Sequence, residues 1–170
     1  MRRLTVEESR QLEAAEGWLG LGNSAEAQAE LAPLLACLGS HPEVLNVQWQ
    51  VLAAQHDWDR ALEIASRLIT TAPDYPPGWI HRSYALHELK RTREARDNLL
   101  LVVDKFAKDV TICYNLACYE CCLGRLDRAR RWLRAACKAG DPASIRRVAL
   151  EDPDLFPLRE VIRGMGESKG

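Results

Sequence analysis

The sequence predicts an all-α protein built from a repeated helical hairpin. Three observations predict it: an alanine recurs every 34 residues, apolar residues recur in phase with it, and turn residues or prolines separate the segments. The alanines are Ala27, Ala61, Ala95 and Ala129. Four residues after them stand Leu31, Ala65, Leu99 and Leu133. Several columns in one register indicate an internal repeat, where a single coincidence would be weak evidence.

Composition sets the broad class. The chain has 170 residues, of which 47% are hydrophobic and 28% are charged, which is typical of a globular protein. Its net charge of -1 argues against a nucleic-acid partner. No apolar run approaches the roughly 18 residues of a membrane helix. The first residues after Met1 carry no apolar stretch, so we expect no signal peptide, a cytoplasmic location and reduced cysteines.

Charge is distributed unevenly along the chain. Residues 1–63 hold 4 basic and 10 acidic side chains, a net charge of -6. Residues 64–150 hold 16 basic and 9 acidic side chains, a net charge of +7. The basic residues of this middle segment recur at helix-like spacing. They include Arg91, Arg93, Arg96, Arg125, Arg128 and Arg131. A solvated helix face is the favoured interpretation, and a docking face for an acidic partner is the alternative.

One repeat shows the expected hairpin. A first helix begins at Pro42, which is tolerated in a first turn, and ends at Ala54. A polar turn over 55–57 leads to an amphipathic second helix over 58–69, which the proline-rich segment 72–77 ends. The recurring alanine is expected where the two helices approach closely. At the equivalent turns, Gly22 and Gly124 suit a tight bend better than His56 and Lys90 do.

The chain resembles the tetratricopeptide repeat (TPR) family, whose 34-residue motif forms one helix–turn–helix. The resemblance covers units 8–41, 42–75, 76–109 and 110–142. It implies a right-handed superhelical solenoid of four repeats in a single domain over residues 1–164. Trp79 stands at the first-helix aromatic position and Pro73 at the closing proline. Trp49, in a small-residue column, and Glu120, in place of an aromatic, depart from the motif.

After Gly140 the period stops. Residues 143–164 are expected to form capping helices, because the last repeat of a solenoid otherwise exposes an apolar face. The apolar residues expected to cover it are Leu155, Phe156, Leu158 and Ile162. The run from Asp152 to Leu158 resembles the closing segment of bacterial TPR proteins, which suggests a small bacterial-type member. Residues 165–170 are expected to be a flexible tail.

The sequence shows no catalytic constellation, so we expect no enzyme and no cofactor. Four thiols fall on one predicted helix, namely Cys113, Cys118, Cys121 and Cys122. One straight helix cannot direct all four at one ion, because Cys113 points roughly 140° away from Cys118. Cys118 and Cys122 lie some 40° apart on one face. We therefore expect packing cysteines, no metal site and less than stoichiometric zinc.

The resemblance implies a non-enzymatic adaptor that binds a peptide or partner helix in a concave groove lined by the first helices. The groove residues it implies are Asn46, Val47, Gln50, Ala53, Ile80, His81, Tyr84, His87, Glu88, Thr111, Tyr114, Asn115, Cys118 and Cys122. Tyr84 and Tyr114 are the candidate binding hot spots, and packing against neighbouring helices is the alternative for both.

The expected partner is a protein or peptide, with no nucleic acid and no membrane involved, and the chain is expected to be a monomer or a weak dimer. Repeats that clamp the C-terminal carboxylate of heat-shock chaperones carry basic groove residues, which these positions lack. That specialisation is therefore disfavoured. The alternative function is a dedicated chaperone for a secreted or aggregation-prone client.

Overall fold

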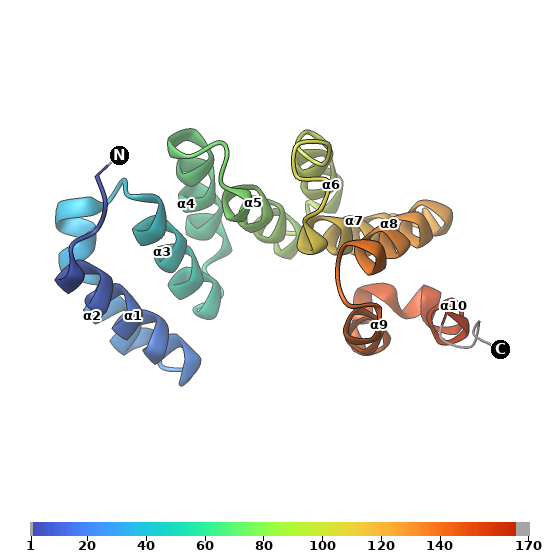
Figure 1. Ribbon diagram of the computed structural model, residues 1–170, viewed down its shortest axis with the longest axis horizontal. Coiled ribbons are helices and arrows are strands. Elements are labelled where there is room, and N and C mark those ends of the chain that lie inside the picture. The colour runs from blue at the N-terminus through green and yellow to red at the C-terminus, as the bar shows by residue number, and fades with distance from the viewer. Residues whose placement is uncertain (1, 166–170) are drawn as a thin grey trace. The chain divides into compact units, whose positions relative to one another are not determined.

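The computed structural model describes residues 2–165, and every regular element in that range is a helix (Figure 1). The predicted all-α class is therefore confirmed. The chain divides into two compact units, residues 1–89 (unit 1) and residues 90–170 (unit 2). That residues 1–164 form one continuous solenoid domain stays a prediction. Between residues 2 and 165, no helix has both the length and the apolar character that crossing a membrane requires.

Unit 1 is a series of packed helices. They are α1 (Val6–Gly20), α2 (Ser24–Leu38), α3 (Pro42–Ala54), α4 (Trp58–Thr71) and α5 (Pro76–Glu88). α1 packs against α2 and α3 against α4, as the hairpin pattern predicts, and α1 and α5 each also contact α3. The first helices α1, α3 and α5 therefore bring side chains from separate hairpins onto one surface.

Unit 2 combines a further hairpin with the capping segment. Its elements are α6 (Thr92–Leu100), α7 (Val110–Cys122), α8 (Leu126–Ala139), α9 (Pro142–Glu151), the 3-10 helix η1 (Pro153–Leu158) and α10 (Arg159–Gly164). Residues 101–108 form turns between α6 and α7. α7 packs against α8, and η1 returns from the end of α9 to contact α7. The capping segment thereby covers the last hairpin, as expected.

Backbone conformation follows the repeat at the hairpin turns. Gly22, His56, Lys90 and Gly124 all have a positive φ, of 75°, 57°, 63° and 74°. Glycine adopts this left-handed conformation without strain, whereas His56 and Lys90 adopt it against their intrinsic preference. The turn geometry is therefore set by the hairpin packing on either side.

The alanine column is buried throughout. Ala27, Ala61, Ala95 and Ala129 each have 0% of their surface exposed. For Ala27, Ala61 and Ala129, this burial supports the close approach of paired helices that the sequence predicts.

Two charged side chains of the middle segment, Arg96 and Glu120, are buried. Arg96 is buried, with its Nε donating to Asp97 Oδ1 at 2.9 Å, so the solvated-face interpretation is wrong for Arg96. Arg93 and Arg131 are exposed, as predicted. Glu120 is buried on α7, where one of its carboxylate oxygens lies 3.5 Å from a guanidinium nitrogen of Arg125. Arg128 Nη1 lies 3.9 Å from the other carboxylate oxygen, so the buried glutamate has two basic neighbours.

The capping residues divide into two groups. Leu155, Leu158 and Ile162 are buried, as predicted. Phe156 is 49% exposed, and its ring lies against the Arg159 guanidinium, with 4.5 Å between the guanidinium carbon and the ring centroid. Residues 153–158 form a 3-10 helix, whose three-residue turn directs Phe156 away from its apolar neighbours.

The end of the described chain is anchored. Met165 caps α10, and its carbonyl oxygen accepts a hydrogen bond from Arg146 Nη1 at 3.3 Å. The rest of the predicted tail, residues 166–170, lies outside the described residues.

Candidate peptide-binding site

The first helices of unit 1 surround a hollow of about 520 Å³. Its lining residues are Ser9, Leu12, Glu13, Glu16, Glu43, Asn46 and Tyr75. The lining contains three carboxylates and no basic side chain, and we call it the acidic hollow.

Helix periodicity explains how these residues come together. Ser9, Leu12, Glu13 and Glu16 follow the i, i+3, i+4, i+7 pattern, which places them on one face of α1. Glu43 and Asn46 are three residues apart on α3, so they also share a face. Because α1 contacts α3, the two stripes meet along one surface.

The hollow is electrostatically negative. Glu13, Glu16 and Glu43 are exposed, and none of them forms an ion pair within residues 2–165. The pKa of the Tyr75 hydroxyl is raised by burial and, to a lesser degree, by the negative charges of Glu43 and Glu16. A hollow lined by charges of one sign concentrates the field and attracts groups of the opposite sign.

An aromatic cluster lies beside the hollow and consists of Trp49, Trp58, His81 and Tyr84. The Trp49 and His81 rings stack with their centroids 3.8 Å apart and an interplanar angle of 8°. Tyr84 meets Trp49 edge-on at 6.1 Å and Trp58 at 5.7 Å. Tyr84 remains 41% exposed, whereas Trp49 is buried. The cluster therefore presents one exposed tyrosine on a rigid aromatic base.

Asn46 links the hollow to this cluster. His81 Nε2 lies 2.7 Å from Asn46 Oδ1, and burial lowers the pKa of His81 to about 4. The imidazole is therefore neutral at physiological pH and donates its Nε2 proton to the amide oxygen. The hydrogen bond and the ring stack together fix the orientation of both side chains.

Unit 2 carries a separate pocket with a different lining. It has a volume of about 210 Å³ and lies between α7 and α9. Its lining residues are Val110, Thr111, Tyr114, Ser144, Ile145 and Val148. Four of the six are aliphatic or aromatic, so we call it the apolar pocket.

Tyr114 and Cys118 converge on Asp152, which lies between α9 and η1. The Tyr114 hydroxyl donates to Asp152 Oδ2 at 2.8 Å, and the Cys118 thiol lies 3.5 Å from the same oxygen. Burial, and then the charges of Asp152 and Asp154, raise the pKa of Cys118 above its ordinary value. Cys118 is therefore protonated at neutral pH, which is the opposite of a nucleophilic cysteine.

Comparison with known proteins identifies the fold. No protein-family model and no curated protein sequence matches the chain. The chain is similar to the crystal structure of a thermophilic TPR protein from Thermus thermophilus, with a TM-score of 0.72 and 19% identity over 80% of this chain and 76% of that one. It is also similar to residues 41 to the end of MamA from Desulfovibrio magneticus RS-1, with a TM-score of 0.70 and 16% identity over 98% and 99% of the two chains. The chain has a TPR-type fold.

The TPR positions account for the acidic hollow. The TPR resemblance implies that positions two, five, six and nine of each repeat belong to the groove lining. In the repeat that begins at residue 8, these positions are Ser9, Leu12, Glu13 and Glu16. All four line the hollow, as does Glu43 at position two of the second repeat. The groove residues predicted from the sequence began at the second repeat, residues 42–75. Of the residues that line the acidic hollow, they included only Asn46. The same positions find Glu13 and Glu16 in the first repeat, and Glu43 stands at position two of the second repeat.

The predicted groove residues fall into three groups. Asn46, His81 and Tyr84 come together around Trp49 in unit 1, and Tyr114 and Cys118 come together at Asp152 in unit 2. The remaining predicted residues differ in burial. Val47 is buried in the core of unit 1, so the groove prediction is wrong for Val47, whereas Thr111 and Cys122 are exposed. The half-buried ones are Gln50, Ala53, Ile80, His87, Glu88 and Asn115. From the sequence, Trp49 is only a departure from the small-residue column, and nothing in its own helix indicates that it contacts His81 and Tyr84.

Proposed function

We propose that this chain is a non-enzymatic adaptor that binds a peptide or partner helix along its first helices, with a Lys or Arg side chain of the partner in the acidic hollow. The observation that carries the proposal is the set of three exposed glutamates without ion-pair partners, Glu13, Glu16 and Glu43, at TPR groove positions.

A basic side chain is the occupant that suits these charges. Three carboxylates around one hollow repel one another, and a cation between them relieves that repulsion. Tyr75 and Asn46 add polar groups to the same lining, and Leu12 adds apolar surface for the aliphatic stem of a lysine or arginine. A C-terminal carboxylate, by contrast, would be repelled.

The aromatic cluster supports a peptide as the ligand. Asn46 belongs to the hollow and is hydrogen-bonded to the cluster, so an extended segment that occupies the hollow would continue toward Tyr84. Rigid, partly exposed tyrosines are common energetic centres of protein interfaces. The protonated state of Cys118 is also in keeping with a binding role rather than a catalytic one.

Matched peptides test the proposal. Three fluorescent peptides would share one sequence and differ only in a central pair of residues, which is Lys, Gln or Glu. We expect the chain to bind the Lys peptide most tightly and to lose that preference as salt is raised, because exposed charges are screened beyond about 8 Å at physiological ionic strength. Fluorescence anisotropy measures each dissociation constant.

A triple variant locates the preference. Glu13→Gln, Glu16→Gln and Glu43→Gln together should weaken binding of the Lys peptide at least about tenfold, since each ionic contact contributes roughly 0.5 kcal/mol. The control removes three exposed carboxylates from the second helices α2 and α4 and should leave binding nearly unchanged. It consists of Glu26→Gln, Asp59→Asn and Glu63→Gln. Equal losses in both triple variants, or no preference for the Lys peptide, would reject the acidic hollow as the binding site.

A further inference from the structure

The capping segment places two carboxylates next to the thiols of α7. Cys118, Asp152 and Asp154 each offer a metal-ligating atom, and these three atoms lie within 4.8 Å of one another. The residues come from two segments more than 30 positions apart in the chain. Sequence reasoning about α7 alone found too few converging ligands for a metal, because it could not include the start of η1.

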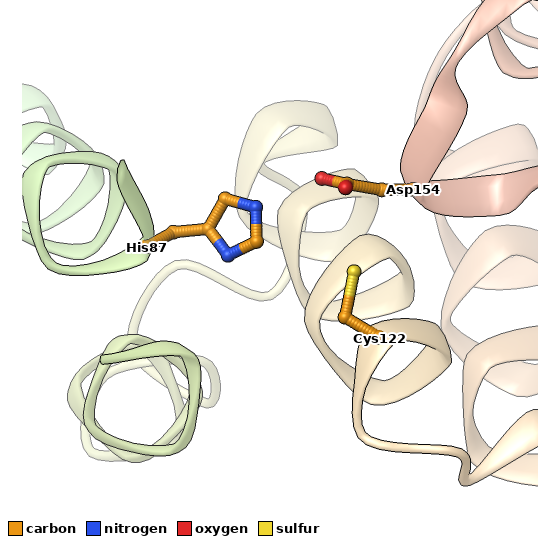
Figure 2. A group of neighbouring side chains, drawn as sticks. All are labelled: His87, Cys122 and Asp154. Atoms are coloured by element: carbon orange, nitrogen blue, oxygen red, sulfur yellow. The ribbon is translucent and has the colours of Figure 1, made fainter. Parts of the chain in front are cut away.

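Cys122 lies one helical turn beyond Cys118 on the same face of α7. Its thiol is hydrogen-bonded to Asp154, and Figure 2 shows its sulfur turned toward the Asp154 carboxylate. Cys122 is exposed, while Cys118 is buried. The cluster therefore reaches from solvent into the interior of unit 2 and leaves a route by which an ion could enter.

We propose that Cys118, Asp152 and Asp154, with Cys122 as a fourth ligand, form a binding site for a thiophilic divalent cation of the zinc and cadmium class. This site is independent of the acidic hollow and of the proposed peptide binding.

The donor set selects the ion. Two sulfurs and two carboxylate oxygens match the four-coordinate sites of Zn²⁺, whereas Mg²⁺ and Ca²⁺ require oxygen ligands alone. Each thiol that binds the ion releases its proton to solvent, and the ion then neutralises both sulfur and carboxylate charges.

Neighbouring hydrogen bonds already orient the carboxylates. Tyr114 donates to Asp152 Oδ2, and the backbone N–H of Asp154 donates to Asp152 Oδ1 at 3.0 Å. Such outer contacts fix ligand direction in metal sites. The ion would connect residues 152–154 of the capping segment to α7, so its structural effect would be to hold the cap on the last hairpin.

Cadmium titration tests the site, because the Cd–thiolate bond has its own ultraviolet absorption. The full chain would carry Cys37→Ser, which removes an exposed thiol on α2. We expect a saturable signal at one Cd²⁺ per chain that Zn²⁺ displaces and Mg²⁺ does not. Amide hydrogen exchange in residues 152–158 should slow when Zn²⁺ is added.

Variants in the same background distinguish this site from adventitious thiol binding. Cys118→Ser and Asp154→Asn should each weaken Cd²⁺ binding at least about tenfold. Cys137→Ser, which alters a half-buried thiol on α8, should leave it unchanged. Asp154→Asn, with far-ultraviolet circular dichroism to verify folding, carries the test if Cys118→Ser does not fold. No saturable signal, or undiminished binding in Asp154→Asn, would overturn the proposal.

Discussion

His81 shows how one residue of the binding surface is held in place. It stacks on Trp49 and hydrogen-bonds Asn46, and burial lowers its pKa to about 4 from the ordinary value of 6.5. The folded state therefore keeps the imidazole neutral at a pH where the unfolded chain binds a proton. Stability from this group is complete above pH 6.5 and is lost as the pH falls toward 4.

This shift predicts a pH-dependent stability that a single variant removes. Between pH 7 and pH 5 the His81 contribution to the free energy of unfolding should fall by about 2 kcal/mol. His81→Phe keeps an aromatic ring against Trp49 but cannot titrate, so its stability should fall by less over the same range. Urea unfolding of both proteins at the two pH values measures the difference. Equal losses would show that His81 is not held neutral by the fold.

At the scale of the helices, the alanine column is where the hairpins are most sensitive to substitution. Ala61 on α4 and Ala95 on α6 are fully buried and stand at the same position of successive repeats. A close-packed site has no room for added methylenes, because neighbouring side chains must leave their preferred rotamers to admit them.

Leucine substitution measures this packing. Ala61→Leu and Ala95→Leu should each destabilise the chain by roughly 1–3 kcal/mol in chemical unfolding. Ala36→Leu, at an exposed position of α2, makes the same chemical change without steric conflict and should stay within about 0.5 kcal/mol of the parent. Unchanged stability in both buried variants would remove the close-packing explanation of the column.

Sequence periodicity predicted the helices and turns because the repeat itself carries the information. The spacing that relates Gly22 to Gly124 also placed turns at His56 and Lys90, and all four have a positive φ. Periodicity could not place side chains outside the repeat. Phe156 and Asp152 belong to the capping segment, whose docking on α7 depends on tertiary contacts that no column of the repeat encodes.

Across the whole chain, the near-zero net charge conceals an excess of negative charge in the N-terminal part. Residues 1–63 carry a net charge of -6, and the sequence predicted this imbalance. It did not predict that Glu13, Glu16 and Glu43 gather at one hollow, because that requires the contact between α1 and α3. In the basic middle segment, Arg96 is buried, whereas Arg93 and Arg131 are exposed.

An NMR titration of the isotope-labelled full chain with the Lys peptide tests most directly whether the first helices of unit 1 bind the partner through the acidic hollow. If they do, backbone amide shifts will concentrate in α1, the first turns of α3 and Tyr75. Shifts concentrated instead on the outer face of α8, around Arg131 and Trp132, would contradict it.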